Sequence, residues 1–390
     1  MNALAQEMIS EGGLIDILNV LDERNANSGE MWHSMIRYLD VKARMKGIPI
    51  RGAFELTPLC NLGCRMCYAH MSETQLSKCG KKVLTGEQWI NLIDQAVDEG
   101  LMYTLFTGGE AMLHPDFDQI YLHALQKGML LTVNTNGLLL TEKRIKFFQL
   151  HPPKMIQVSL YGADEDEYEM VTGRRAFSQV MAGIERLKNS GLFFEVGVTP
   201  SRYMKEHGKS VIRLLDSMEV FYSVNSSLFQ PRIGTGRNKE NHDLSLDEYV
   251  DLFKLRAQLQ GRHFVPTCCE EVRPTGGTNA EEVKGFKCAA GRSSYAITWD
   301  GYLHPCLMMT EIGCSLFEVP FAEAWKIIHH TAMEYPFPRE CIGCAYQEIC
   351  TVCIKQHSYG APAGHANKKL CERAQRLALE GMIKLESDAN

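Results

Sequence analysis

The stretch Ala53-Phe-Glu-Leu-Thr-Pro-Leu-Cys60-Asn-Leu-Gly-Cys64-Arg-Met-Cys67-Tyr68 decides which fold and which kind of site to expect. It begins as a short apolar run, Ala53–Thr57, which we predict to be a β-strand. Three cysteines follow at once, with the spacing C-x₃-C-x₂-C. In parallel α/β folds, a loop directly after a strand is where functional residues gather. The cysteines are therefore candidates for a site at the end of this strand.

The triplet predicts an iron–sulfur cluster with an open position. A [4Fe–4S] cube has four irons, whereas this loop offers three thiolates, those of Cys60, Cys64 and Cys67. One iron is then open to an external ligand, which is typical of a catalytic centre. Gly63 allows the loop to fold tightly around the cube. The alternatives are a zinc loop or incidental thiols, but zinc sites prefer four ligands in separated pairs.

Composition narrows the class of protein. The chain has 390 residues, 45% hydrophobic and 23% charged, with a net charge of −6 and no long basic run, so nucleic acid is not an expected partner. Apolar runs such as Met129–Val133 are too short to span a bilayer. The N-terminus does not resemble a secretory signal, so we expect a cytoplasmic protein and no membrane partner. Fourteen cysteines in that compartment indicate metal or cluster ligation, not disulfides.

From about residue 52, strand and helix patterns alternate. Six strands are predicted, at Ala53–Thr57, Tyr103–Thr107, Leu130–Asn134, Met155–Ser159, Phe193–Thr199 and Tyr222–Phe229. The predicted helices between them are Gly86–Glu99, Phe117–Gln126, Thr141–Leu150, Phe177–Asn189 and Lys209–Met218. This alternation implies parallel strands with helices packed outside. We therefore predict an α/β fold, a partial (β/α)6 TIM-like barrel with its site at the carboxyl ends of the strands.

The pattern divides the chain into four parts. Residues 1–50 form an N-terminal helical segment with two apolar stripes, Leu14–Leu21 and Met31–Leu39, and residues 51–235 form the barrel. Residues 236–285 form a connecting region between the barrel and the cysteine-rich part, with a helix at Leu246–Leu259. Residues 286–390 are cysteine-rich with little periodicity up to a closing helix at Glu372–Leu385, so we expect metal to hold this part together.

Three further motifs stand at successive strand ends and a basic motif follows them, and with these the chain resembles the radical SAM (S-adenosylmethionine) superfamily over about Phe54–Gln230. These motifs are Thr107-Gly108-Gly109-Glu110, Asn134-Thr135-Asn136-Gly137, Val158-Ser159-Leu160-Tyr161-Gly162 and Thr172-Gly173-Arg174. The resemblance implies that Cys60, Cys64 and Cys67 hold the catalytic [4Fe–4S] cluster. It implies SAM contacts from Tyr68, Gly108, Gly109, Glu110, Asn136, Ser159 and Arg174, with Glu110 binding the SAM amino group.

The C-terminal cysteines resemble the SPASM extension of radical SAM enzymes, which carries two auxiliary [4Fe–4S] clusters. By this resemblance, the outer cluster is held by Cys341, Cys344, Cys350 and Cys371, and the inner one by Cys288, Cys306 and Cys353. The last gap of the central run is x₂, where the SPASM pattern has x₃, which puts the geometry at Cys353 in doubt. Cys268 or Cys269 supplies a fourth inner ligand, or the position is open to substrate. A structural zinc module is the alternative, but its pairs are normally separated by about 15–20 residues.

The resemblance also implies a mechanism. The reduced cluster cleaves SAM to a 5′-deoxyadenosyl radical, which takes a hydrogen atom from an unactivated C–H bond. Auxiliary clusters then accept an electron, giving a net two-electron oxidation. The implied cofactors are SAM and three [4Fe–4S] clusters. The implied partners are a peptide or protein substrate, such as a ribosomal precursor peptide, and an external electron donor such as flavodoxin or ferredoxin.

Several functions compete at this point. Crosslinking of a ribosomally synthesised peptide through a thioether, C–C or ether bond is favoured. Anaerobic sulfatase maturation is less favoured, because Leu307 stands where those enzymes have an aspartate after the cysteine. Oxidation of a small molecule and a non-catalytic scaffold are further alternatives. The candidate bases are Glu55, Asp116, Tyr161 and His304.

Overall fold

The strands in the described residues form one sheet. The structure, a computed structural model, describes residues 28–225, 228–232, 244–259, 284–346, 350 and 353–380. The strands are β1 (Arg51–Thr57), β2 (Tyr103–Gly108), β3 (Leu130–Thr135), β4 (Met155–Ser159), β5 (Phe194–Val198), β6 (Tyr222–Val224), β7 (Ser294–Ile297), β8 (Tyr302–His304) and β9 (Cys314–Ser315). Their order is β6-β5-β4-β3-β2-β1-β7-β8-β9. Neighbours from β6 through β7 run parallel, and β8 and β9 add an antiparallel edge.

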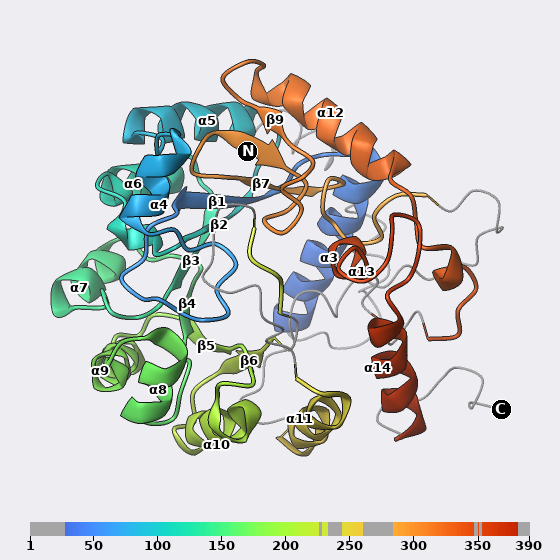
Figure 1. Ribbon diagram of the computed structural model, residues 1–390. Coiled ribbons are helices and arrows are strands. Elements are labelled where there is room, and N and C mark those ends of the chain that lie inside the picture. Colours follow the sequence, from blue (N-terminus) through green and yellow to red (C-terminus); the bar gives the residue numbers. More distant parts are fainter. Residues whose placement is uncertain are drawn as a thin grey trace.

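Helices cover the outer side of this curved sheet (Figure 1). The helices of the first half are α3 (Ser28–Lys46), α4 (Glu73–Cys79), α5 (Gly86–Asp98), η1 (Ala111–Leu113), α6 (Phe117–Gln126), α7 (Glu142–Leu150), α8 (Glu165–Thr172) and α9 (Phe177–Lys188). Those of the second half are η2 (Lys205–Gly208), α10 (Lys209–Ser217), α11 (Leu246–Leu259), α12 (Phe321–Glu334), η3 (Arg339–Cys341), α13 (Ile354–His357) and α14 (Lys368–Leu379). Among them no helix has both the length and the apolar character needed to cross a bilayer.

The main core lies between the sheet and these helices. Phe54 of β1 stacks on Trp89 of α5, with ring centroids 5.5 Å apart, and on Phe106 of β2 at 6.1 Å. All three side chains are fully buried. Alternate residues of each strand thus face the helices, and the residues between them face the barrel interior.

The six predicted barrel strands and the parallel sheet are confirmed. Every predicted strand is present within one or two residues at its start, but β6 ends at Val224 and does not reach Phe229. The helix at Leu246–Leu259 is present as predicted. The closing helix begins at Lys368, four residues before the predicted Glu372, because the Asn367 side chain accepts a hydrogen bond from Lys369 N and caps it.

The cysteine-rich part contains more regular structure than its sequence pattern indicates. β7 pairs with β1 in parallel, with Ala53 opposite Ala296, and so extends the barrel sheet. Tyr295 of β7 packs against Phe54 and against Phe321 of α12, with centroids 6.3 and 5.0 Å away. A four-residue strand is too short to show periodicity, and its pairing depends on a partner more than two hundred residues away.

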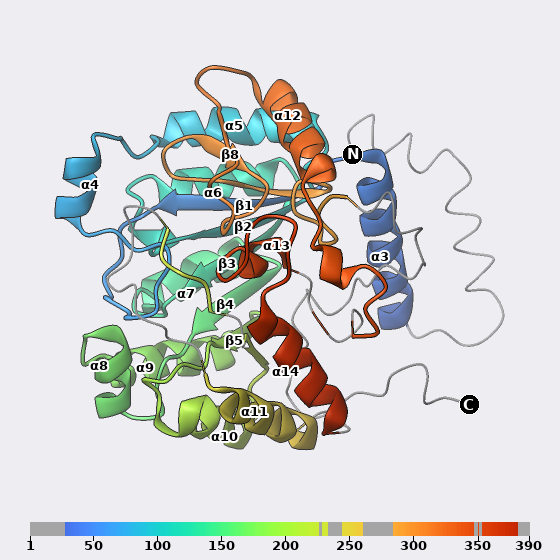
Figure 2. The same cartoon turned by 45° about the vertical axis from the view of Figure 1, so that its right-hand side comes forward.

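Helix α3 lies at the end of the barrel where the strands begin, opposite the end that carries α4 (Figure 2). Asp40 of α3 accepts two hydrogen bonds from the guanidinium of Arg51, at 2.9 and 2.6 Å. Ala43 packs with Ile50 and Tyr103 in a small separate core. The second predicted stripe of the N-terminal segment therefore belongs to a helix, whereas the first, Leu14–Leu21, lies outside the described residues, as does the predicted boundary at 235/236.

Candidate active site

The three loop cysteines lie at the carboxyl edge of the sheet. Cys60, Cys64 and Cys67 are each half-buried in the loop that joins β1 to α4. Gly63 N donates to Thr172 O at 2.8 Å, so the end of α8 supports this loop. The structure therefore places the triplet where the sequence predicts a site, at the carboxyl ends of parallel strands.

Hydrogen-bond donors point at two of these sulfurs. Leu62 N and Asn136 Nδ2 each donate to Cys60 Sγ at 3.4 Å, and His70 N donates to Cys67 Sγ at 3.3 Å. Burial raises the pKa of Cys60 to about 11 and also raises the pKa of Cys67. Both thiols therefore hold their protons more tightly than an ordinary cysteine, and N–H groups donate to both sulfurs. These features fit an iron–sulfur cluster, because bound iron would stabilise the thiolates directly.

Two glycines let the end of β2 lie against the cysteine loop. A Cβ on Gly109 would stand 2.3 Å from Leu59 O, and one on Gly108 would stand 2.4 Å from Thr57 O. Gly109 N donates to Thr57 O at 2.7 Å, and Glu110 N donates to Leu59 O at 2.9 Å. Gly108 also has a φ of 143°. These glycines were expected to allow a close backbone approach. In the structure, the end of β2 makes this approach to the backbone that leads into the cysteine triplet.

Glu110 is buried beside this contact, with 1% of its surface exposed. Its carboxylate accepts hydrogen bonds from Asn136 N at 2.8 Å, from Met112 N at 3.3 Å and from Thr135 Oγ1 at 3.1 Å. Burial nevertheless raises the pKa of Glu110 to about 7. Among the described residues it has no ion-pair partner, so a cationic ligand group would stabilise its charged form.

Asn136 connects β3 to the cysteine loop. Its Nδ2 donates both to Cys60 Sγ and, at 2.7 Å, to Asn61 Oδ1. Its Oδ1 accepts from Leu138 N at 3.1 Å. The side chain is buried and fully used by these contacts. It therefore positions the loop through Cys60.

The remaining predicted SAM contacts surround the same loop. Arg174, which follows the left-handed Gly173 at the end of α8, donates to Asn61 O at 3.2 Å. Ser159 ends β4, opposite Gly197 of β5. The ring of Tyr68 lies under the guanidinium of Arg232, at 5.4 Å, and Tyr68 O accepts from Arg232 N at 3.1 Å.

The four candidate bases lie in different surroundings. Glu55 is buried and forms a two-pronged ion pair with Arg232, one arm of which measures 3.0 Å. Asp116 accepts from Gly86 N at 2.9 Å. His304 Nδ1 lies 2.7 Å from Ile312 O, and burial lowers its pKa. Burial raises the pKa of Tyr161 well above its ordinary value, with the charge of Cys64 adding to the rise.

Three of the residues just described were not predicted from the sequence. Asn61 and Thr135 support Asn136 and Glu110, and Arg232 neutralises Glu55. Asn61 and Thr135 lie inside motifs that are visible in the sequence, so their place in these motifs could have identified them as supporting residues. Arg232 lies in an irregular segment 177 residues from Glu55, and only the folded chain brings the two together.

The seven C-terminal cysteines divide into two sets by their electrostatic influence on one another. In the described part of the chain no three His, Cys, Asp or Glu side chains are close enough to hold one metal ion. The grouping shows in their electrostatics. Burial raises the pKa of Cys306 to about 12, and the charges of Cys288 and Cys353 add to the rise. Burial likewise raises the pKa of Cys341 to about 12, with contributions from the other members of its group, Cys350, Cys371 and Cys344.

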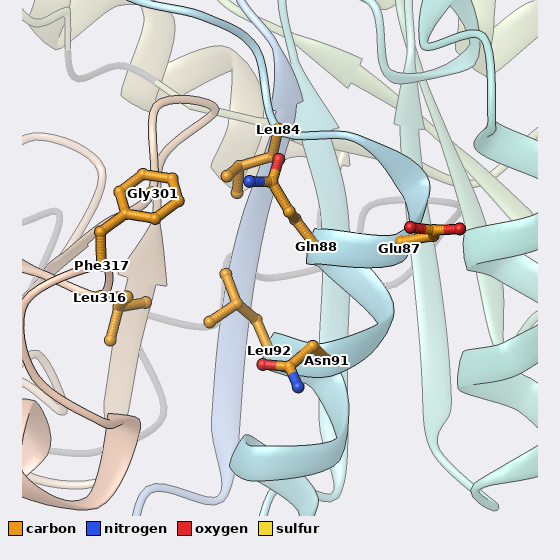
Figure 3. A pocket seen from close by; sticks show the side chains of 8 residues that line it. All are labelled: Leu84, Glu87, Gln88, Asn91, Leu92, Gly301, Leu316 and Phe317. Atoms are coloured by element: carbon orange, nitrogen blue, oxygen red, sulfur yellow. The ribbon is translucent and has the colours of Figure 1, made fainter.

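Two surface hollows lie away from these cysteines. One, of about 270 Å³, lies between α5 and the β8–β9 segment, and Phe317 and Leu84 stand on its two sides (Figure 3). The other, of about 520 Å³, is formed by η1, α6 and Arg144 of α7 and includes Asp116. No cysteine lines either hollow, so neither belongs to the site. Cys268 and Cys269, the predicted extra ligands, lie outside the described residues.

Known proteins share both the sequence pattern and the fold. Residues 54–204 match the model of the radical SAM superfamily. The AdoMet-dependent heme synthase of Nitratidesulfovibrio vulgaris is 26% identical over 350 residues, which cover 83% of this chain and 92% of the relative. The subtilosin biosynthesis protein AlbA of Bacillus subtilis is 29% identical over 363 residues, covering 87% of this chain and 74% of AlbA.

Solved structures agree with the fold. Streptococcus suis SuiB bound to its precursor peptide SuiA superposes with a TM-score of 0.65 at 16% identity, covering 94% of this chain and 89% of SuiB. The enzyme anSMEcpe with bound AdoMet gives 0.67 at 17% identity, covering 86% and 98%. The predicted partial barrel is thereby confirmed. Because the matched stretch holds all three loop cysteines and five parallel strands of the sheet, the chain contains a radical SAM domain.

Proposed function

We propose that this radical SAM enzyme oxidatively modifies a peptide or protein, and that it forms a thioether, C–C or ether crosslink in the maturation of a ribosomally synthesised peptide. The observation that carries the proposal is the meeting of Cys60, Cys64 and Cys67 with the buried Glu110 at the carboxyl edge of the sheet. Seven further cysteines gathered in two groups support an oxidative outcome.

The loop cysteines are the proposed ligands of the catalytic [4Fe–4S] cluster. When bound, the reduced cluster and SAM together supply an oxidant that removes a hydrogen atom from an unactivated C–H bond. The protein holds the loop rigidly, through the Gly109 and Asn136 contacts described above. The N–H donors at Cys60 and Cys67 stabilise the charge on sulfur.

Glu110 is the proposed acceptor of the SAM ammonium. Hydrogen bonds from Asn136, Met112 and Thr135 hold the Glu110 carboxylate in one orientation. Its burial strengthens its attraction to a positively charged ligand group. Gly108, Gly109, Asn136, Ser159, Arg174 and Tyr68 complete the proposed SAM site. Arg174, which is exposed at the loop, has the right charge for the SAM carboxylate.

We propose two auxiliary clusters for the remaining cysteines. The outer one takes Cys341, Cys344, Cys350 and Cys371, and the inner one takes Cys288, Cys306 and Cys353. The cysteine charges that raise the pKa of Cys306 and of Cys341 all come from their own set, which supports this division, and Cys353 contributes at Cys350 after Cys371 and Cys344. The fourth inner ligand is either Cys268 or Cys269 or a substrate thiolate. Clusters at these positions would accept the second electron, and an external electron donor such as flavodoxin or ferredoxin would reduce the loop cluster.

A peptide substrate is supported by the similar proteins. SuiB binds the precursor peptide SuiA, anSMEcpe has been seen with peptides, and AlbA serves subtilosin biosynthesis. Leu307 follows Cys306 where sulfatase-maturing enzymes have an acid, which disfavours formylglycine formation.

A second candidate is oxidation of a porphyrin. The heme synthases match nearly their whole length, 92% of the Nitratidesulfovibrio vulgaris enzyme. Another relative, from Methanosarcina barkeri, is an Fe-coproporphyrin III synthase. Fe-coproporphyrin III is therefore the probe that tests this alternative, with haem formation followed by absorbance.

The deciding experiment begins with anaerobic purification and reconstitution. Dithionite and SAM should yield 5′-deoxyadenosine, and a Cys60→Ala variant should not. A candidate peptide encoded beside the gene should lose about two hydrogens per modification in mass spectrometry. A lone zinc ion in place of the cluster, or turnover of Fe-coproporphyrin III without any peptide change, contradicts the proposal.

A further inference from the structure

The interior wall of the barrel carries polar side chains on its β3–β5 side, several of them partly exposed. Along β3 and β4, buried residues alternate with partly exposed ones, and the partly exposed set includes Asn134, Gln157 and Ser159. The buried set, which includes Val133 and Val158, belongs to the core under the helices. A barrel interior filled with side chains would bury both sets. The side chains of this wall are therefore not completely covered by their neighbours.

One layer of this wall lies beneath the proposed SAM site. Asn134 of β3 is opposite Gln157 of β4, and Gln157 is opposite Glu195 of β5. The next layer toward the carboxyl edge contains Ser159 and Gly197. Two residues along a strand span about 6.6 Å, so Glu195 lies that far below the level of Ser159. A group bound there is too deep to be the reacting atom and serves as an anchor.

Only one of the two carboxylate oxygens of Glu195 accepts hydrogen bonds from the described residues. Gln157 Nε2 and Ser223 Oγ both donate to Glu195 Oε1, the second at 3.1 Å. Oε2 accepts no hydrogen bond from the described residues, yet it is not among the fully buried polar atoms that lack a partner. It therefore keeps some accessible surface. Asn134 Oδ1, in the same layer, is a buried oxygen without a hydrogen-bond partner.

The charge of this layer is not balanced. Only 5% of the surface of Glu195 is exposed, and it forms no ion pair in the part of the chain that the structure describes. By contrast, the buried Glu55 of β1 is neutralised by Arg232. A buried carboxylate is costly unless a cation compensates it, and the Oε2 of Glu195, which accepts no hydrogen bond from the described residues, is where a cation would bind.

We propose that Glu195, with Asn134 beside it, binds a cationic group of the substrate, an ammonium or guanidinium, and so anchors a lysine, an arginine or an N-terminal amine of the peptide. This inference rests on the proposed function and specifies the chemistry of its substrate. Glu195 is a substrate-binding residue in this scheme, and the reaction takes place one layer above.

The test uses the reconstituted holoenzyme with SAM and a defined peptide mixture. The peptides are acetylated, amidated heptamers with Lys, Arg, norleucine, Gln or Glu at the centre and random flanks. Retention on the enzyme is measured by ultrafiltration and mass spectrometry. Wild type should retain the Lys or Arg peptides about tenfold better than the norleucine peptides. Glu195→Gln should reduce that ratio to about one, because it keeps the shape and the Gln157 contact but removes the charge.

Two further variants keep the result interpretable. Glu195→Asp retains the charge and should retain part of the preference, whereas Glu185→Gln, on the exposed face of α9, should behave as wild type. An absent basic preference in wild type, or the same preference in Glu195→Gln, overturns the proposal. Formation of 5′-deoxyadenosine without peptide is measured in parallel. If it persists while the preference is absent, only the recognition proposal fails; if wild type never forms it, the proposed function fails.

Discussion

Asn136 Nδ2 and Cys60 Sγ are joined by a hydrogen bond of 3.4 Å that connects the end of β3 to the cysteine loop after β1. The bond joins two motifs that are 76 residues apart and that each stand at the end of a strand. It fixes the first cysteine of the triplet and places a dipole at its sulfur. Loop geometry and sulfur electrostatics therefore depend on the same side chain.

Removing this side chain should lower the reduction potential of the loop cluster. Asn136→Ala deletes one hydrogen bond to sulfur, worth about 1 kcal/mol, which equals about 40 mV for one electron. The measurement is an EPR-monitored redox titration of the reconstituted enzyme. Asn189→Ala, at the exposed end of α9, is the matched control and should leave the potential unchanged. A potential that stays the same in Asn136→Ala speaks against a role at the cluster.

SAM affinity should rise with pH through the pKa of Glu110. Burial raises this pKa to about 7 in the ligand-free protein, so below that pH the carboxyl is neutral and cannot pair with an ammonium. Equilibrium dialysis with SAM across that pH range measures the effect. Glu110→Gln should bind SAM at least about tenfold more weakly at high pH and lose the pH dependence. The surface variant Glu87→Gln is the control, and an unchanged profile in Glu110→Gln would argue against the assigned contact.

A methyl group at Gly109 should disrupt the contact between β2 and the cysteine loop. The added Cβ meets Leu59 O at 2.3 Å, and a backbone carbonyl cannot turn aside as a flexible side chain can. We expect Gly109→Ala to lower the free energy of unfolding by at least about 2 kcal/mol and to reduce iron incorporation. Gly197→Ala is the control, since its Cβ makes an ordinary contact at 3.5 Å. Urea unfolding and iron analysis compare the two.

Breaking the Glu55–Arg232 pair should cost far more than breaking a surface pair. Their side chains are 1% and 8% exposed, so Arg232→Met leaves a buried, unpaired carboxylate, which costs about 3–5 kcal/mol. The double variant Glu55→Gln with Arg232→Met should recover much of that loss. Lys284 and Glu334 are 62% and 54% exposed, and Lys284→Met should cost less than about 1 kcal/mol. Equal losses at both pairs in urea unfolding would contradict the expected effect of burial.

Iron content should report the two C-terminal cysteine groups separately. Cys341→Ala and Cys306→Ala should each lose about four irons per chain relative to wild type, because each removes a ligand from a different cube. Cys79→Ala alters an exposed thiol at the end of α4 and should lose none. Iron and sulfide analysis of the reconstituted proteins makes the comparison. A loss of one zinc ion instead would point to the structural zinc module.

The sequence by itself determined the local features. The six barrel strands and the five predicted helices between them each have their own hydrophobic period, so their order and approximate bounds followed from neighbouring residues alone, whereas the short helices α4 and α8 did not. The spacing of Cys60, Cys64 and Cys67 and the glycines before Glu110 are local as well. Parallel strands then place those motifs at one edge, and this is where the structure has them.

Only the tertiary structure decided the contacts between distant segments. β7 joins β1, Arg232 neutralises Glu55, and Glu195 faces the interior because of the register between β4 and β5. Such pairings depend on which segments meet and in which register, and shifting a strand by one residue reverses the direction of every side chain. Local periodicity carries no information on that choice. The fold was therefore predictable from the sequence. Which buried carboxylate has a cationic partner, as Glu55 has and Glu195 has not among the described residues, could be decided only from the paired strands.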